Sequence, residues 1–284
     1  MAQLSDLCYN VSDTDHRRSA MPIRAIAFDL DDTLLRPDNT ISAYTVDVLR
    51  RAHEQGMLII PASGRTFGSM MKAVPPILAL SACLCSCNGS EVWSPDGTLM
   101  MQELLPVPLA HQVAAFAAER GVYCQTYAPD RFFYTIENEW AASYAKLSSL
   151  EGECVGDLTT FITRPVTKLL MMDEPDRIAR LMQEARTLFG NRASLTCSKP
   201  YFLECNPLKA TKANALRWCA SHFGFAMDDL VCFGDSLNDV SMLQAAGTGL
   251  CVANAREDVK ALGFPVCRSN AEDGVARYIE ENLL

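Results

Sequence analysis

Three carboxylates crowd into one short stretch near the start of the sequence, AIAFDLDDTLL at residues 25–35. Asp29, Asp31 and Asp32 follow directly after the apolar run at 25–28. Like charges at the end of a buried strand repel one another and lose hydration, so they are costly unless they bind or react with something. A divalent cation offsets such repulsion, and a carboxylate beside it can act as a nucleophile toward phosphorus.

Other segments also place polar residues where predicted strands end. The polar candidates in these segments are Ser63, Lys212, Asp235, Asn238 and Asp239. In an open parallel sheet, binding and catalytic residues lie at the carboxyl ends of the strands. We therefore expect these residues to lie with Asp29 in one site.

The residue types in this set suit phosphoryl chemistry. Two carboxylates and a third from another strand make a cage of hard oxygen ligands, which is the preference of Mg²⁺. Asp31, two residues beyond Asp29, lies on the same side of an extended chain, where it can protonate a leaving oxygen and then activate water. Ser63 and Lys212 can contact the other phosphoryl oxygens and stabilise the charge that develops there.

The segment FDLDDTLL at 28–35 resembles the first motif of the haloacid dehalogenase superfamily of aspartate-nucleophile phosphatases, and the chain is similar to its Cof-type members. The resemblance implies that Asp29 is the nucleophile and Asp31 the general acid and base. It also implies that Asp29, Asp31 and Asp235 hold Mg²⁺. Asp32 departs from the family, in which many members have glycine, although aspartate tolerates turn conformations.

Two further segments resemble the second and third motifs of the family. ASGR at 62–65 is similar to the second motif, which implies that Ser63 binds phosphate and that Gly64 and Arg65 support it. ATKANAL at 210–216 resembles the third motif with Lys212 as its lysine, and Lys209 is the less favoured candidate.

The fourth motif and an Asn-Gly pair complete the resemblance. GDSLNDVSML at 234–243 is similar to the family's fourth motif. This similarity implies that Asp235 is a metal ligand, that Asn238 lies near the phosphate and that Asp239 steadies the metal site. CNGS at 87–90 resembles the Asn-Gly that follows the next strand in Cof-type members.

Strand and helix patterns alternate in the two flanks of the chain. The expected elements there are strands at 23–28, 57–63, 230–235 and 249–253 and helices at 42–55 and from 66 onward, with Ser42 as a cap. This alternation predicts an α/β fold with a Rossmann-like parallel sheet covered by helices on both faces.

The middle of the chain has a different pattern. It predicts a hairpin at 91–101, a helix at 107–120, a strand pair at 122–127 and 132–137, a strand at 166–172 and a helix at 176–189. The chain between Ser63 and Lys212 greatly exceeds the roughly 30 residues of a strand–helix–strand unit, so it contains an inserted domain. We expect a loose tail at 1–20, a catalytic core at 21–90 and 200–284, and an inserted α+β cap at 91–199. The resemblance implies that this cap closes over the site and selects the substrate.

The charge and composition of the chain exclude some classes of binding partner. The net charge is -9, from 25 basic and 34 acidic residues, and no local cluster of Lys and Arg provides a basic face. This argues against nucleic acid or an anionic membrane as a partner. The N-terminal stretch lacks the apolar core of a secretory signal, so we expect a cytoplasmic protein, as a monomer or homodimer.

Two groups of residues, three closely spaced cysteines and the aromatic residues of the insert, each allow two interpretations. Cys83, Cys85 and Cys87 alternate as thiolate ligands on one strand face would, but no second Cys or Cys/His pair completes a four-ligand site, so small core side chains are favoured. The aromatic candidates are Tyr127, Tyr134, Trp140 and Tyr144. We expect them in a core or domain interface rather than against substrate.

The predicted function is Mg²⁺-dependent hydrolysis of a small phosphomonoester, a sugar phosphate or a phosphorylated cofactor, through a phosphorylated Asp29. One alternative is a phosphotransferase of the phosphomutase kind, which shares the nucleophile and passes the group to a sugar. Another is a non-enzymatic phosphosugar sensor that has kept the fold. The carboxylates of Asp29, Asp31 and Asp235 argue against the sensor hypothesis, because a protein that only binds a phosphosugar does not need an acid at position 31.

Overall fold

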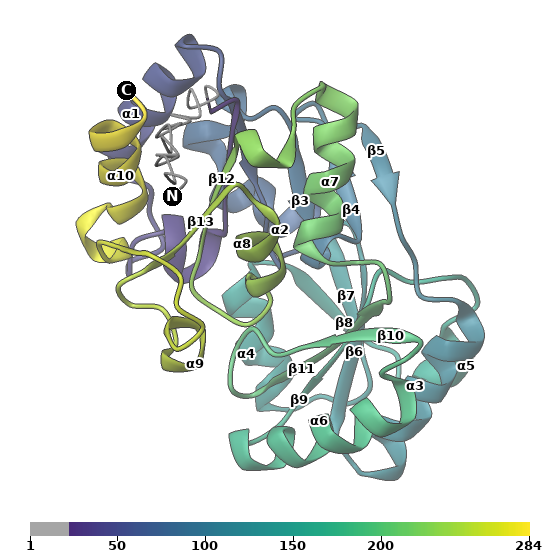
Figure 1. The fold of residues 1–284 in the computed structure, drawn as a ribbon. Coiled ribbons are helices and arrows are strands. Elements are labelled where there is room, and N and C mark those ends of the chain that lie inside the picture. Colours follow the sequence, from purple (N-terminus) through teal and green to yellow (C-terminus); the bar gives the residue numbers. More distant parts are fainter. Residues whose placement is uncertain (1–22) are drawn as a thin grey trace, which may run out of the picture.

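The computed structural model describes residues 23–284, so the predicted tail at 1–20 and the predicted start of the folded unit at Met21 lie outside the described residues. Within residues 23–284 the strands form three sheets. Figure 1 shows two bodies: a core built from both flanks of the chain and an insert built from its middle. Among the described helices, none has the length and apolar character needed to cross a bilayer.

The core sheet is parallel and has the order β14–β13–β12–β1–β2. Its strands are β1 (Ala25–Phe28), β2 (Leu58–Pro61), β12 (Leu230–Gly234), β13 (Thr248–Val252) and β14 (Val266–Cys267). Phe28 of β1 lies opposite Phe233 of β12 on one side and Pro61 of β2 on the other. The residues that follow these three strands therefore meet at one edge of the sheet.

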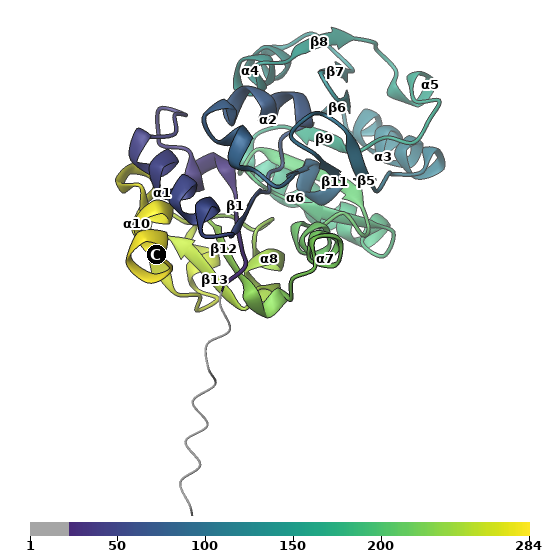
Figure 2. The ribbon, with the colours of Figure 1, turned by 90° about the horizontal axis from the view of Figure 1, so that it is seen from above.

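Helices cover both faces of this sheet, as the alternating pattern predicted. They are α1 (Ala43–Glu54), α2 (Phe67–Ala73), α7 (Lys212–Phe223), α8 (Val240–Ala245), α9 (Glu257–Lys260) and α10 (Gly274–Asn282). Helix α1 packs against α10 and α7 against α8, and the two pairs lie on opposite sides of the sheet (Figures 1 and 2). The hydroxyl of Ser42 accepts a hydrogen bond from the Thr45 N–H, which confirms Ser42 as the cap of α1.

A small antiparallel sheet joins the core to the insert. Its strands are β3 (Leu84–Ser86), β4 (Glu91–Trp93) and β5 (Leu99–Gln102). Strands β4 and β5 are the predicted hairpin, and a bridge between Ala62 and Cys85 places β3 beside the end of β2. Because β4 pairs with β3, the residues just after 90 belong with this connecting sheet.

The insert is built on a sheet of order β10–β11–β9–β6–β7–β8, antiparallel except for the parallel pair β7–β8. Its strands are β6 (Tyr123–Ala128), β7 (Arg131–Tyr134), β8 (Glu151–Cys154), β9 (Leu169–Met172), β10 (Ala193–Thr196) and β11 (Phe202–Pro207). Strand β11 pairs with β9 and β10, so the insert extends to Pro207 rather than ending at the expected residue 199. Sequence patterns missed this because β11 carries two polar residues in an otherwise apolar run.

Each face of the insert's sheet has its own apolar cluster. The helices of the insert are α3 (Val107–Glu119), α4 (Glu139–Ser148), α5 (Leu158–Phe161) and α6 (Pro175–Phe189). Leu169 and Met171 of β9 pack in the cluster formed with α3 and α6, whereas Leu170 and Met172 pack in the cluster formed with α4. Side chains alternate along a strand, so every second residue of β9 and β11 faces α4 and the catalytic core.

Candidate active site

Asp29 directly follows β1, which lies between β12 and β2 in the core sheet. Its backbone N–H donates to the carbonyl of Phe233 at 3.0 Å, which continues the ladder with β12 and fixes the position of its carboxylate. The side chain is buried, and the Nζ of Lys212 donates to Asp29 Oδ1 at 2.6 Å. Burial raises the pKa of Asp29 well above its ordinary value; Lys212 opposes this, and repulsion from Asp239, Asp235 and Asp31 adds to it.

Lys212, the first residue of α7, is fully buried and serves two carboxylates. Its Nζ also donates to Asp239 Oδ1 at 2.5 Å. Burial alone lowers the pKa of a lysine, but attraction to Asp239 and Asp29 outweighs that effect and raises the pKa of Lys212. The two carboxylates therefore favour the charged form of Lys212 behind Asp29.

Asp239 organises the loop that follows β12. Its Oδ2 accepts hydrogen bonds from the backbone N–H groups of Asp235 at 2.9 Å and Ser236 at 3.0 Å, while Oδ1 accepts from Lys212. Both oxygens are thus engaged. A Cβ on Gly234 would come within 2.5 Å of the Asp239 Cβ, so only glycine allows this loop to close.

Asp235 adds the third carboxylate. The hydroxyl of Thr33 donates to Asp235 Oδ1 at 2.8 Å and orients it. Burial and then repulsion from Asp239 raise the pKa of Asp235 to about 7. Carboxylate oxygens of Asp29, Asp235 and Asp239 lie within 4.8 Å of one another, so among the described residues these three could hold a metal ion.

Asp31 is oriented differently from the expected metal set. Its two oxygens accept hydrogen bonds from Arg65, at 2.8 Å from Nε and 2.7 Å from Nη2. Burial opposes ionisation, but the hydrogen bonds and charge of Arg65 lower the pKa of Asp31. Asp31 lines the pocket but does not join the carboxylates around Lys212. Asp32 beside it adopts a left-handed conformation with φ of 57°, as its turn tolerance allows.

Ser63, Gly64 and Arg65 form a tight turn after β2, hereafter the phosphate-binding turn. The Ser63 hydroxyl is buried and accepts the Arg65 N–H at 3.2 Å. A Cβ on Gly64 would lie 3.0 Å from Asn88 Oδ1, so the turn also requires a small residue at its centre. Asn88 in turn accepts a hydrogen bond from Asn238 Nδ2 at 2.9 Å, which brings the predicted Asn238 to the same site.

A pocket that is partly open to solvent lies over these residues. Its walls from the core include Asp29, Asp31, Ser63, Asp235 and Asn238. Its walls from the insert are Tyr144, Leu147, Ser148, Lys168, Leu170, Ser198, Lys199, Phe202 and Glu204. The structure therefore brings most of the predicted residues to one cavity that the insert covers. Lys212 and Asp239 do not line it; they lie behind Asp29, joined to it through the Lys212 ammonium.

Several pocket residues were not predicted from the sequence. Lys168 and Glu204 form a buried ion pair with an N–O distance of 2.7 Å, and Lys199 lies 3.6 Å from Asp32. A charge directly before or within an apolar strand, as in KLLMM at 168–172 or FLEC at 202–205, was the available signal. Of the four aromatic candidates, Tyr144 lines this pocket, while Tyr127 and Tyr134 are buried in the α4 cluster and Trp140 packs beside it.

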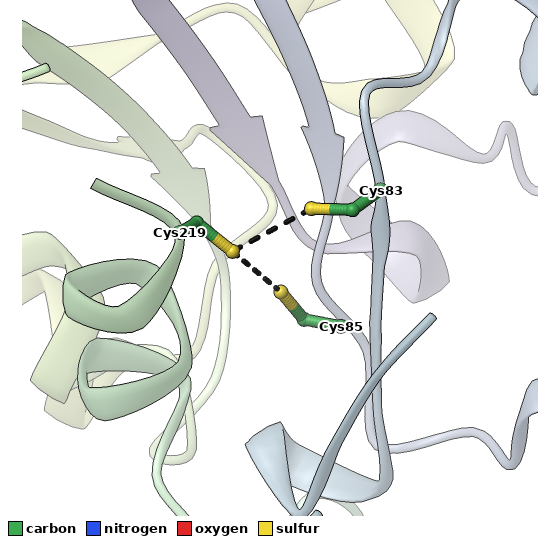
Figure 3. Close-up of side chains that lie close together, drawn as sticks. All are labelled: Cys83, Cys85 and Cys219. Carbon is green, nitrogen blue, oxygen red and sulfur yellow. Dashed lines mark hydrogen bonds between the residues drawn. The ribbon is translucent and has the colours of Figure 1, made fainter. Parts of the chain in front are cut away.

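Three cysteines form a separate cluster in the core (Figure 3). The Cys219 Sγ on α7 lies 3.5 Å from the Cys83 Sγ and 3.9 Å from the Cys85 Sγ. All three side chains are fully buried among apolar residues, and no other potential ligand of the described chain joins them. Cys87 is not a member. Burial of Cys83 and Cys85 in the apolar core agrees with their expected use as small core side chains, and the three sulfurs also lie within 4.8 Å of one another, as the ligands of a metal ion would.

Comparisons with known proteins point to one family. A family model described as haloacid dehalogenase-like hydrolase matches residues 26–279. The chain is 29% identical over 269 residues to the 5-amino-6-(5-phospho-D-ribitylamino)uracil phosphatase YcsE of Bacillus subtilis, covering 94% of this chain and 99% of that protein. It is 30% identical over 232 residues to an HMP-PP phosphatase of an Enterobacter species, covering 82% of this chain and 85% of that protein.

Solved structures agree with this result. A haloacid dehalogenase-like hydrolase from Bacteroides thetaiotaomicron superposes with a TM-score of 0.80 at 27% identity, covering 91% of this chain and 98% of that one. A haloacid dehalogenase-like hydrolase from B. subtilis superposes with a TM-score of 0.82 at 23% identity, covering 92% and 100%, which supports the fold.

Proposed function

The chain belongs to the haloacid dehalogenase-like hydrolases, and from this premise we propose that it hydrolyses small phosphomonoesters with Mg²⁺ through a phosphorylated Asp29. The substrate class is a sugar phosphate or a phosphorylated cofactor. The observation that carries the proposal is the position of Asp29: a buried carboxylate at the floor of a covered pocket, 2.6 Å from the ammonium of Lys212.

The donor set at this floor fits a magnesium ion. Mg²⁺ prefers oxygen ligands and keeps several waters, so one or two carboxylates suffice. Both oxygens of Asp239 already accept hydrogen bonds, so we assign the cation to Asp29 and Asp235. When bound, the ion would neutralise the charge that these carboxylates and a phosphoryl group bring together. Asp31 was expected among the ligands, but Arg65 holds both of its oxygens, so we propose only its acid and base role.

In the first half-reaction, an Asp29 carboxylate oxygen forms a bond to phosphorus and the bond from phosphorus to the ester oxygen breaks. Asp31, once it has left its pair with Arg65 and taken up a proton from solvent, gives that proton to the departing oxygen, and an alcohol leaves. In the second, Asp31 accepts a proton from water as the water oxygen attacks phosphorus. Inorganic phosphate departs and the Asp29 carboxylate is restored. During this cycle the carboxylate of Asp31 must leave Arg65 and contact the substrate.

The remaining residues bind and orient the phosphoryl group. The Ser63 hydroxyl and the Lys212 ammonium supply donors for oxygens whose charge increases in the transition state. Asn238, held by Asn88, adds an amide at the same edge. The insert excludes water from the pocket and contacts the alcohol portion of the substrate.

Phosphate release from a panel of phosphorylated metabolites, with Mg²⁺ present, tests this function. We expect release from at least one sugar phosphate or phosphorylated cofactor, and transient labelling of Asp29 in protein quenched with acid. Transfer of the group to an added sugar with little free phosphate would instead support a phosphotransferase. Binding of phosphosugars without turnover or labelling would contradict the enzymatic proposal.

A further inference from the structure

We propose that Lys168 is a positioning residue that holds the phosphate-binding turn in its working conformation, and so couples that turn to closure of the insert over the core. This inference rests on the proposed function for its catalytic consequence. The hydrogen bond on which it depends is independent of that function.

Lys168 crosses the boundary between the two bodies. It lies directly before β9 in the insert, and its Nζ donates to the backbone carbonyl of Gly64 in the core at 2.8 Å. Gly64 stands between Ser63, which is proposed to bind phosphate, and Arg65, which holds Asp31. One side chain of the insert is thus hydrogen-bonded to the central residue of the turn.

Burial makes this contact strong and specific. Only 2% of the Lys168 side chain is exposed, so its ammonium must find partners in the protein. Glu204 of β11, equally buried, accepts a second hydrogen bond from Nζ at 2.7 Å. The aromatic ring of Tyr127 lies 5.0 Å from Nζ, within range of a cation–π interaction.

The insert's sheet fixes the direction in which Lys168 points. Glu204 lies opposite Leu170 in the β9–β11 pair, and Lys168 is two residues before Leu170, on the same face. Lys168 and Glu204 are therefore diagonal neighbours on the face turned toward the core. Glu204 also accepts a hydrogen bond from Thr196 on β10, so the acid that orients Lys168 is itself oriented.

The turn depends on this contact because, among the described residues, Lys168 is the one donor to the carbonyl of its central residue. The Ser63 N–H and C=O are bonded to Cys85 and Asn88, but the Gly64 carbonyl points to Lys168. Glycine is the most flexible residue, so release of its carbonyl lets the peptide rotate. Rotation of that peptide would move the Arg65 N–H away from the Ser63 hydroxyl and disturb the donor geometry around phosphate.

A double-mutant cycle with inorganic phosphate as the probe tests the positioning role. Lys168→Met is expected to raise the inhibition constant of inorganic phosphate about tenfold through misplacement of the turn. In a Ser63→Ala background the same change should be less than about twofold, because the group that Lys168 positions is gone. Lys168→Arg, which keeps the charge and a donor, should recover part of the loss. Equal effects in the two backgrounds would overturn the proposal.

Hydrogen exchange gives a readout that does not require activity. In Lys168→Met/Glu204→Gln, which keeps most of the overall stability, amide exchange in the segment 63–66 should be about tenfold or more faster than in the wild type, while the buried strand β12 is unchanged. Unchanged exchange in 63–66 would also overturn the proposal. If the wild-type protein released no phosphate from any ester, the proposed function would fail while this measurement still decided the role of Lys168.

Two matched variants control for folding. Lys146→Met removes an exposed lysine from α4 of the same insert and should change neither readout. If Lys168→Met does not fold, Lys168→Met/Glu204→Gln removes the charge from both members of the buried pair, and both measurements are made on it. The expected loss of coupling to Ser63 is the same.

Discussion

Two buried lysines, one in each body of the molecule, face different numbers of acids. Lys212 in the core contacts Asp29 and Asp239, with Asp235 in the same carboxylate group, so its surroundings carry an excess of negative charge. The charge of Lys168 in the insert is balanced by Glu204 alone, and its Nζ also donates a hydrogen bond to the backbone carbonyl of Gly64. The excess creates a place for a cation and a reacting phosphoryl group, whereas the balanced pair can only hold structure in place.

The sharpest test of this contrast removes the nucleophile. Asp29→Asn should lower Mg²⁺-dependent release of nitrophenol from p-nitrophenyl phosphate by about 10⁵-fold or more, because no covalent intermediate can form. The melting temperature should not fall, since the change removes a carboxylate from a repulsive group. Asp130→Asn, on the exposed loop between β6 and β7, is the matched control. Activity near the wild-type level in Asp29→Asn would refute the assignment of the nucleophile.

A smaller effect on turnover is expected when the acid and base is removed. Asp31→Asn should slow the steady state by about 10²–10⁴-fold, because water is no longer activated. An aryl leaving group needs little help from an acid, so the first half-reaction with p-nitrophenyl phosphate should persist. Stopped-flow measurements should then show a burst of about one nitrophenol per protein, and mass spectrometry a phosphorylated Asp29. A slow reaction without a burst would place Asp31 outside the second half-reaction.

Metal binding provides a test that needs no substrate. Mg²⁺ at about 100 times its dissociation constant should stabilise the folded protein by about 2.7 kcal/mol, and a chelator should remove both this gain and the activity. Asp235→Asn should abolish most of the gain because it loses one of the two proposed carboxylate ligands. Thermal unfolding with and without Mg²⁺ measures both. An undiminished gain in Asp235→Asn would exclude Asp235 from the metal site.

Apart from its effect on phosphate binding through the turn, the pair of Lys168 and Glu204 should contribute to the stability of the fold. Lys168→Met leaves Glu204 buried and unpaired and should cost about 3–5 kcal/mol of unfolding free energy, whereas Lys168→Met/Glu204→Gln should cost much less. Urea unfolding at neutral pH compares the two variants with the wild type. Equal costs would mean that the pair is not electrostatically coupled.

The pH dependence of the same pair is the smallest expected effect. Attraction to Lys168 lowers the pKa of Glu204 despite its burial, so the stability from Glu204 is present above its unfolded pKa of about 4.3 and declines as pH falls through the folded value. Attraction to Glu204 raises the pKa of Lys168, so its contribution holds below about 10.4 and declines only as pH rises through the folded value. The stability difference between wild type and the double variant should be flat from about pH 5 to 10. A slope near pH 7 would contradict this.

Much of the core could be predicted because its information is local. A buried strand that ends in an acid, such as 25–29 or 230–235, can be recognised from a few residues, and Ser42 identified the start of α1 in the same way. The insert was harder. Polar residues on the inner face of its sheet interrupt the apolar pattern, so β11 was missed and the boundary was set too early.

The sequence alone determined which residues stand at the carboxyl ends of parallel strands, and parallel geometry requires those ends to share one edge. Only the tertiary structure decided that Arg65 holds Asp31, that both oxygens of Asp239 are occupied, and that Lys168 and Glu204 meet over Gly64. These contacts join segments far apart in the chain, and no local pattern records which strand lies beside which or which face of a sheet turns toward the core.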